Sequence, residues 1–417
     1  MYYTLVILFV LLMLFGFLSE RTLEYLNAKY FHLPIPKEFN KYFSLDFQNR
    51  NYNYKIAKYK YSLIDSSTSF LFTFSIWYMG GFGFLSNLAS HITDNEVLQT
   101  LLFFGILGLL SIILSLPFTY YNHFVIEEKF GFNKMTRKTF FLDQVKSVLL
   151  VIVFGGGLIS LIVWVYQSFP LHFWWIIWII ISVFMIFITA FYAQLLVPLF
   201  NKQTELEDSE LKQAIHSFVG SAGFSLSHIF VMDGSKRSSK ANAYFTGLGN
   251  QKRIVLYDTL INDLENREIV AVLAHELGHY KHKHTLLNMV LGIVQTGIML
   301  YVLSLFINPN SSIGMHLNSV VAMNPNLQKA HFYLGLIGFG IIYSPVSMLI
   351  GILMNMLSRK FEYQADKFAA NHGFGDELKS ALVKLSKNSL SNLAPHPIYV
   401  FVNYSHPPLI SRMRHMN

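Results

Sequence analysis

Residues 275–279 read His-Glu-Leu-Gly-His, which places two imidazoles and a carboxylate at a spacing that suits a metal ion. On a helix, positions i and i+4 face the same way, so His275 and His279 can reach one ion. Zinc lowers the pKa of a bound water to about 7, and Glu276 could take a proton as that water attacks a peptide carbonyl. A chance match on a polar helix end near a membrane surface is the alternative. The pattern favours a hydrolytic zinc site with Glu276 as its general base.

A second acidic motif supplies what such a site still needs, because hydrolytic zinc has three protein ligands and one open position. Glu362 and Asp366 stand at i and i+4 and would face one side of a helix. We expect Glu362 to bind zinc and Asp366 to accept a hydrogen bond from a ligand histidine, although Asp366 could also take part in proton transfer. A solvated helix face is the alternative. The nearby His282 and His284 are expected to be interfacial residues and not ligands.

The composition places these motifs in a membrane protein. Hydrophobic residues make up 53% and charged residues 13% of the 417 positions, whereas a soluble globular chain carries about 25% charged residues. The chain has no cysteine, so a thiolate metal site and a disulfide framework are both excluded. Any transition metal must therefore bind to His, Asp or Glu.

Seven segments are apolar and long enough to cross a bilayer as helices, which takes roughly 20 residues. They cover residues 2–18, 62–89, 98–120, 147–166, 172–200, 285–307 and 331–357. The first lacks a basic start and a small-residue cleavage site, so it is expected to be a retained span and not a signal peptide.

The basic residues alternate with these spans. Loops 19–61, 121–146, 201–284 and 358–417 hold every one of the 32 Lys and Arg residues except Lys329. By the positive-inside rule, this pattern predicts the N-terminus outside and the C-terminus in the cytosol. The net charge of +8 is therefore a topology signal, and no nucleic-acid partner is expected.

Two polar stretches divide the chain into four regions. We expect spans one to five with their loops in 1–200, a cytosolic region in 201–284, the last two spans in 285–357 and a second cytosolic region in 358–417. The fold class is thus an all-α integral membrane protein with a small α+β zinc-protease region on the cytosolic side.

Local patterns predict the elements of the first cytosolic region. An amphipathic helix is expected at 205–220, strands at 229–232 and 253–258, and a loop with an edge strand at 238–249. A helix should then run from Leu264 toward His284 with Asp263 as its N-cap. Residues 308–330 are expected to form a brief connector.

These motifs together resemble the type I CAAX prenyl endopeptidases, membrane zinc proteases that cut behind an isoprenylated C-terminal cysteine. The resemblance covers nearly the whole chain. Besides the two metal motifs at 274–279 and 361–366, it rests on 125–133 (Val-Ile-Glu-Glu-Lys-Phe-Gly-Phe-Asn), 198–201 (Pro-Leu-Phe-Asn), 241–246 (Ala-Asn-Ala-Tyr-Phe-Thr), 405–408 (Ser-His-Pro-Pro) and Arg412. The zinc motifs alone occur in many peptidases, whereas this combination with seven spans is far more specific.

The resemblance implies seven transmembrane helices around a chamber, with one Zn²⁺ at the cytosolic end. It implies that the zinc ligands are His275, His279 and Glu362 and that the base is Glu276. Asn242 would lie on an edge strand that pairs with the substrate backbone. His406 would stabilise the oxyanion, and Arg412, grouped with the substrate-binding residues, would support the site.

The expected function is cleavage near the C-terminus of isoprenylated CAAX-type substrates. The partners are then the lipid bilayer and a lipidated or membrane-associated peptide. A quality-control protease for membrane proteins, without a prenyl requirement, would use the same chemistry. A non-enzymatic receptor or transporter is disfavoured because the spans contain almost no charged residues. The short late loops resemble compact bacterial members, which favours a bacterial inner membrane, with the endoplasmic reticulum membrane as the alternative.

Overall fold

Long helices dominate the computed structural model, which describes residues 1–224, 228–246, 253–308 and 311–416. Six helical stretches among these residues are long and apolar enough to cross a membrane. They are α1 (Tyr2–Lys29), α4 (Glu96–Tyr121), α5 (Arg137–Leu150) continued into α6 (Gly156–Ser168), α7 (Phe173–Leu195) continued into α8 (Val197–Phe200), α12 (His284–Ile307) and α14 (Phe332–Ala369). The prediction of a multi-span membrane protein is confirmed.

The second predicted span is bent, which corrects the expectation of one straight helix over 62–89. It consists of α2 (Leu45–Tyr78) and α3 (Gly81–Ile92), which meet at an angle of 62° and bring the count to seven if taken as one span. The break lies at Gly80, whose φ of 76° suits a residue without a side chain. Because the sequence stays apolar through the glycines, hydropathy alone did not reveal the bend.

The connector at 308–330 is more than a brief loop. It contains α13 (Ser312–Val321), which buries Leu317, Val320 and Val321 in a core with the early residues of α14. The Asn318 side chain accepts a hydrogen bond of 2.8 Å from the backbone N–H of His331, directly before α14. This short helix therefore helps to fix where α14 begins.

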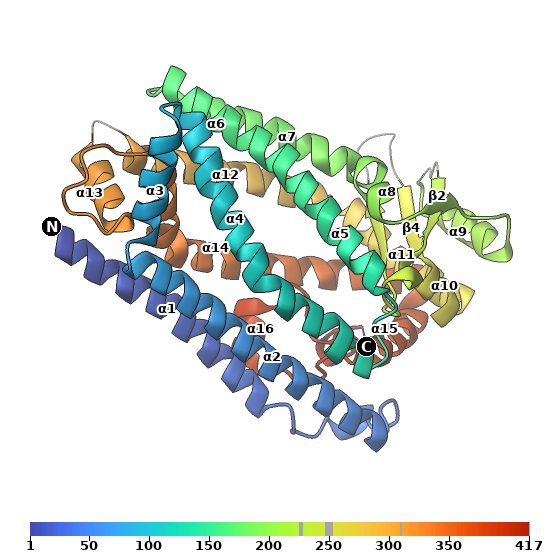
Figure 1. The fold of residues 1–417 in the computed structure, drawn as a ribbon. Helices are drawn as coiled ribbons and strands as arrows, with labels where there is room; N and C mark the ends of the chain where they lie inside the picture. Colours follow the sequence, from blue (N-terminus) through green and yellow to red (C-terminus); the bar gives the residue numbers. More distant parts are fainter. Residues whose placement is uncertain (225–227, 247–252, 309–310, 417) are drawn as a thin grey trace.

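A four-stranded sheet lies at the end of the long helices opposite α3 and α13 (Figure 1). Its order is β1 (Gln203–Glu205), β2 (His228–Met232), β4 (Arg253–Tyr257), β3 (Ala243–Thr246). Only β2 and β4 are parallel. The predicted strands and the edge strand are confirmed, although 247–249 lie outside the described residues. The polar β1 was missed, and it takes the place expected for the start of the next helix, which runs as α9 (Glu210–Ser221).

The metal-motif helix α11 (Asn266–Lys281) begins later than expected. Asp263 is the last residue of α10 (Asp258–Asp263), so its prediction as the N-cap is wrong. Glu265 caps the helix in a capping box with Glu268, whose carboxylate accepts from the Glu265 N–H at 2.9 Å. Glu268 also bonds to Lys384 Nζ at 2.7 Å on α15 (Gly375–Ser389), which fastens the first turn of α11.

The helices α11 and α14 pack closely against each other at Gly278. A Cβ atom at this position would lie 2.9 Å from the Ala365 Cα atom and 3.0 Å from the Phe368 Cβ atom. Contacts under 3.0 Å to backbone require the helices to move, so only glycine allows this separation. Of the two unspecified positions of the His-Glu-x-x-His motif, the second is therefore restricted to glycine in this fold.

Substituting Gly278 by alanine should push α11 away from α14 and separate the residues that both helices present to the site. A displacement of about 1 Å can cost on the order of 10²-fold in rate, so we expect Gly278→Ala to lose most activity and to hold metal more weakly. Metal analysis of the purified protein, paired with a cleavage assay, would show this. The control is Gly351→Ala on α14, where a Cβ meets nothing within 4 Å. Unchanged metal binding in Gly278→Ala would contradict the packing argument.

Candidate metal centre

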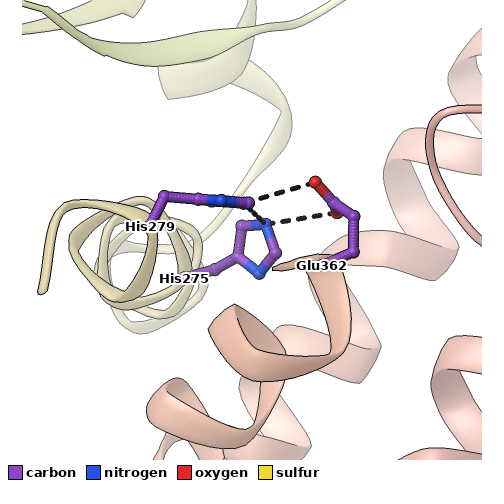
Figure 2. A group of neighbouring side chains, drawn as sticks. All are labelled: His275, His279 and Glu362. Atoms are coloured by element: carbon purple, nitrogen blue, oxygen red, sulfur yellow. Dashed lines mark hydrogen bonds and ion pairs between the residues drawn. The ribbon is translucent and has the colours of Figure 1, made fainter. Parts of the chain in front are cut away.

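Two histidines of α11 and one carboxylate of α14 converge on a common point (Figure 2). The Nε2 atoms of His275 and His279 lie 3.1 Å apart. The Glu362 carboxylate places one oxygen 3.5 Å from His275 Nε2 and the other 3.3 Å from His279 Nε2. Residues distant in sequence are thus brought together as the two motifs predict.

The separations fit a tetrahedral metal ion. Zinc bonds of about 2.0–2.1 Å at tetrahedral angles require ligand atoms about 3.3 Å apart, which is the range observed. In addition, Glu362 Oε2 is buried and meets no donor of the described residues in hydrogen-bond geometry, although His275 Nε2 and Arg412 Nη1 lie 3.5 and 3.3 Å away. A buried carboxylate oxygen without a donor is costly, and a bound cation would satisfy it. The donor set of two imidazoles and one carboxylate suits zinc and leaves a fourth position open.

Behind His275, a buried ion pair orients the imidazole. Asp366 Oδ1 lies 2.9 Å from His275 Nδ1, on the side of the ring away from the other ligands. Arg412, on α17 (Leu409–His415), donates to both Asp366 oxygens at 2.6 and 2.9 Å. A carboxylate at Nδ1 holds the proton there and directs the Nε2 lone pair at the metal.

Arg412 also approaches the ligand carboxylate. Its Nη1 atom lies 3.3 Å from Glu362 Oε2, and the guanidinium is almost fully buried. One cation therefore serves the two carboxylates of Glu362 and Asp366. These contacts are with residues of the site itself, and the grouping of Arg412 with the substrate-binding residues stays a prediction.

His406 also lies beside the centre, on the loop between α16 (Pro397–Asn403) and α17. Its Nε2 atom lies 3.2 Å from Glu362 Oε1, and the side chain is 66% exposed. Arg359 of α14 anchors this loop by donating to the carbonyls of Val400 and Tyr404. The imidazole is thus held beside the ligands while remaining open to an incoming molecule.

Glu276 and Asn242 lie outside this set of polar contacts. Glu276 is partly exposed, and burial raises the pKa of its carboxyl against the opposing influence of the two ligand histidines. Asn242 directly precedes the edge strand β3, and its carbonyl accepts a 3.0 Å hydrogen bond from the Tyr257 N–H. Its side-chain oxygen accepts from the Ala243 N–H at 2.9 Å.

The segment before Asn242 is tied to the membrane helices. Lys240 donates to Glu127 at 2.8 Å and to the Tyr54 hydroxyl at 3.1 Å. Tyr54 and Lys58 of α2 bond to the same buried Glu127 carboxylate at 2.8 and 3.1 Å. Glu127 belongs to the loop motif at 125–133, so that motif helps to place the start of the edge strand.

His284 corrects the sequence analysis. It was expected to be an interfacial residue, yet its side chain is buried and its Nδ1 atom lies 3.0 Å from His279 Nδ1. Its Nε2 atom lies 2.9 Å from Gln364 Oε1. The rule that ligand histidines have a partner on the second nitrogen was applied to one unspecified histidine, through Asp366, and applying it to both would have pointed here. His282 is exposed, as expected.

Together, the multi-span fold and a His-Glu-x-x-His helix that faces a distant carboxylate define an integral-membrane metalloprotease. The domain described as the CAAX prenyl protease N-terminal domain, with five membrane helices, matches residues 24–202. Peptidase family M48 matches residues 205–417. The chain belongs to peptidase family M48 and is a membrane metalloendopeptidase.

Individual relatives agree over most of the chain. CAAX prenyl protease 1 of Saccharomyces cerevisiae is 39% identical over 327 residues, which are 76% of this chain and 72% of that protein. The CAAX prenyl protease 1 homolog of Oryza sativa subsp. japonica is 35% identical over 410 residues, 96% and 94% of the two chains. The crystal structure of S. mikatae Ste24p matches with a TM-score of 0.91 and 32% identity over 99% of both chains. These findings confirm the resemblance inferred from the motifs.

Metal binding at this centre should depend on pH through His275. Burial alone would lower the pKa of this imidazole, but its hydrogen bonds to Asp366 and Glu362 outweigh burial and raise the pKa to about 9 in the absence of metal. Because a metal ion needs the neutral imidazole, it must displace this proton below about pH 9. Apparent affinity for Zn²⁺ should therefore rise with pH and level off near 9.

Competition against a chelator at several pH values between about 6 and 10 would measure this rise. Asp366→Asn removes the carboxylate that stabilises the protonated imidazole, so its curve should shift to lower pH. An affinity that does not change with pH over this range would contradict the assignment.

Proposed function

We propose that this chain is a zinc endopeptidase that cleaves near the C-terminus of isoprenylated CAAX-type substrates. The observation that carries the proposal is the convergence of His275, His279 and Glu362, with ligand atoms 3.1–3.5 Å apart, beside the exposed His406. The substrate class is supported by the names of the relatives, CAAX prenyl protease 1 and its homologs. The membrane fold supports a substrate that carries a lipid.

In this proposal, His275, His279 and Glu362 hold the ion. A bound zinc ion supplies a Lewis acid that brings the pKa of water near 7. Glu276, next to a ligand on the same helix, takes the proton of the attacking water and passes it to the leaving amine. A carboxylate raised in pKa by burial is suited to this exchange near neutral pH.

The surrounding residues are given supporting roles. His406 donates from Nε2 to the oxygen of the carbonyl under attack, for which its exposure beside Glu362 is suitable. Asp366 orients His275, and proton transfer by Asp366 is disfavoured because its side chain is fully buried behind that ring. Arg412 balances the two carboxylates and acts on the ligands more directly than on substrate.

The edge strand offers a place for the substrate backbone. β3 pairs only with β4 in the described sheet, so its other edge presents free N–H and C=O groups. An extended peptide can add to such an edge, with Asn242 at its start. A chamber between the helices would receive the lipid.

We further propose that the N-terminus lies outside and the C-terminus in the cytosol, with the metal centre at the cytosolic end. The distribution of Lys and Arg supports this orientation. The short late loops are the only support for a bacterial inner membrane, whereas the eukaryotic sources of the relatives support the endoplasmic reticulum membrane.

Glu276→Gln tests the proposed chemistry, because it removes the base and keeps every ligand. Cleavage of a farnesylated CAAX peptide should fall on the order of 10²–10⁴-fold, while zinc content stays at the wild-type level. His279→Ala, in contrast, should lose zinc. Cleavage by Glu276→Gln at the wild-type rate would refute the assignment of the base. Failure of wild type on the farnesylated peptide, with cleavage of unrelated membrane proteins, would favour a quality-control protease.

His406→Ala should lower kcat on the order of 10²–10³-fold, as expected for the loss of an oxyanion donor. Because the side chain is exposed, zinc content and thermal stability should not change. The control is His415→Ala, an exposed histidine at the end of α17. A change confined to KM would argue that His406 binds substrate without stabilising the transition state.

A further inference from the structure

The turn after α11 brings a third histidine to the back of the metal centre. Lys283 adopts a left-handed conformation with φ of 57°, and the chain reverses into α12, whose first residue is His284. The N–H groups of His282 and Lys283 bond back to Gly278 and Tyr280 at 3.1 and 2.9 Å, which fixes the turn. His284 is thereby placed against His279, five positions earlier.

The ring of His284 is held in one plane. It stacks on Phe361 with ring centroids 4.0 Å apart and an angle of 12° between the planes. Only 3% of the residue is exposed. Since a buried polar group needs hydrogen-bond partners, both ring nitrogens should be paired, and both have a partner within 3.0 Å.

The contacts determine which nitrogens carry protons. His279 points Nε2 at the other ligands, so its neutral ring carries the proton on Nδ1. That N–H faces His284 Nδ1 at 3.0 Å, which must then be the acceptor. The proton of His284 is left on Nε2, which faces the amide oxygen of Gln364 at 2.9 Å. Donors and acceptors alternate through all three residues without conflict.

We infer that His284 and Gln364 are positioning residues that fix the tautomer and ring orientation of the metal ligand His279. The inference rests on the proposed metal site. His284 is not itself a ligand in this arrangement, because the nitrogen that approaches His279 faces Nδ1 and not the Nε2 atom of the ligand set.

The two ligand imidazoles are then supported differently. His275 has a carboxylate partner whose charge is shared with Arg412, whereas His279 has a neutral chain that ends in an amide. A carboxylate partner makes a ligand imidazole more basic, and a neutral partner orients it without adding charge. His279 is therefore oriented without a third buried carboxylate beside Glu362 and Asp366. Because a neutral partner adds no negative charge to the ligand, a bound ion would keep more of its Lewis acidity.

Three substitutions separate this role from simple packing. His284→Phe keeps a ring against Phe361 and removes the acceptor. His284→Asn places an oxygen acceptor near the position of Nδ1 and removes the ring. His216→Phe is the control, because His216 is an exposed histidine on α9, whereas the ring of His282 stacks on His284 with centroids 5.5 Å apart.

The measurements are the dissociation constant for Zn²⁺ and the visible absorption spectrum of the Co²⁺-loaded protein. Loss of a hydrogen-bond partner to a ligand histidine costs about 10–100-fold in metal affinity. We expect a loss of this size and an altered Co²⁺ spectrum in His284→Phe, with His284→Asn close to wild type and His216→Phe unchanged. A packing role predicts the reverse order, with His284→Asn the more damaging.

Gln364→Leu provides a second route if His284→Phe does not fold, because Gln364 is only partly buried. It removes the last acceptor and should weaken Zn²⁺ binding less than His284→Phe but measurably. Wild-type affinity and spectrum in folded His284→Phe or in Gln364→Leu would overturn the inference. Failure of the wild-type protein to bind Zn²⁺ would instead overturn the proposed function.

Discussion

The close contact of α11 with α14 at Gly278 is the constraint on which the metal centre depends. Each helix carries part of the donor set, and neither part can bind an ion well alone. A side chain at Gly278 would meet the backbone of Ala365, one turn from Glu362, so the absence of a Cβ sets the distance between the imidazoles and the carboxylate. The capping of α11 by Glu265 and Glu268, with Lys384 attached, holds the helix in register along this contact.

Charge balance is the second condition. Glu362 and Asp366 are buried side by side on α14, and buried charges persist only when paired. Arg412 supplies one positive charge to both, and His275 and His279 complete the shell. Without metal, the raised pKa of His275 lets a proton on this ring supply the second positive charge, and a divalent cation would replace that proton when it binds. Folding of the C-terminal segment and metal binding should accordingly support each other.

The features that could be predicted from the sequence are those that helix periodicity determines. The i and i+4 spacings predicted that His275 pairs with His279 and Glu362 with Asp366, because helix periodicity alone places these side chains on one face. Features that depend on backbone turns were missed. The bend at Gly80 is hidden in continuous apolar sequence, and the role of His284 depends on the left-handed Lys283. The start of α11 was misplaced because Asp263 and Glu265 are both plausible N-caps. Asp263 is instead the last residue of the short helix α10, and Glu265 caps α11.

The continuous helix α14 connects the membrane to the chemistry. The apolar stretch ends near Leu357, and the helix runs on without a break through Glu362. Five residues at 1.5 Å each place Glu362 about 8 Å beyond the apolar stretch along the helix axis. No loop intervenes, so this distance along the helix is fixed. A prenyl group on the substrate cysteine would anchor it in the membrane and hold the adjacent bonds near the membrane surface. In the proposed function, the helix that spans the bilayer therefore selects which bonds come within reach of the metal centre.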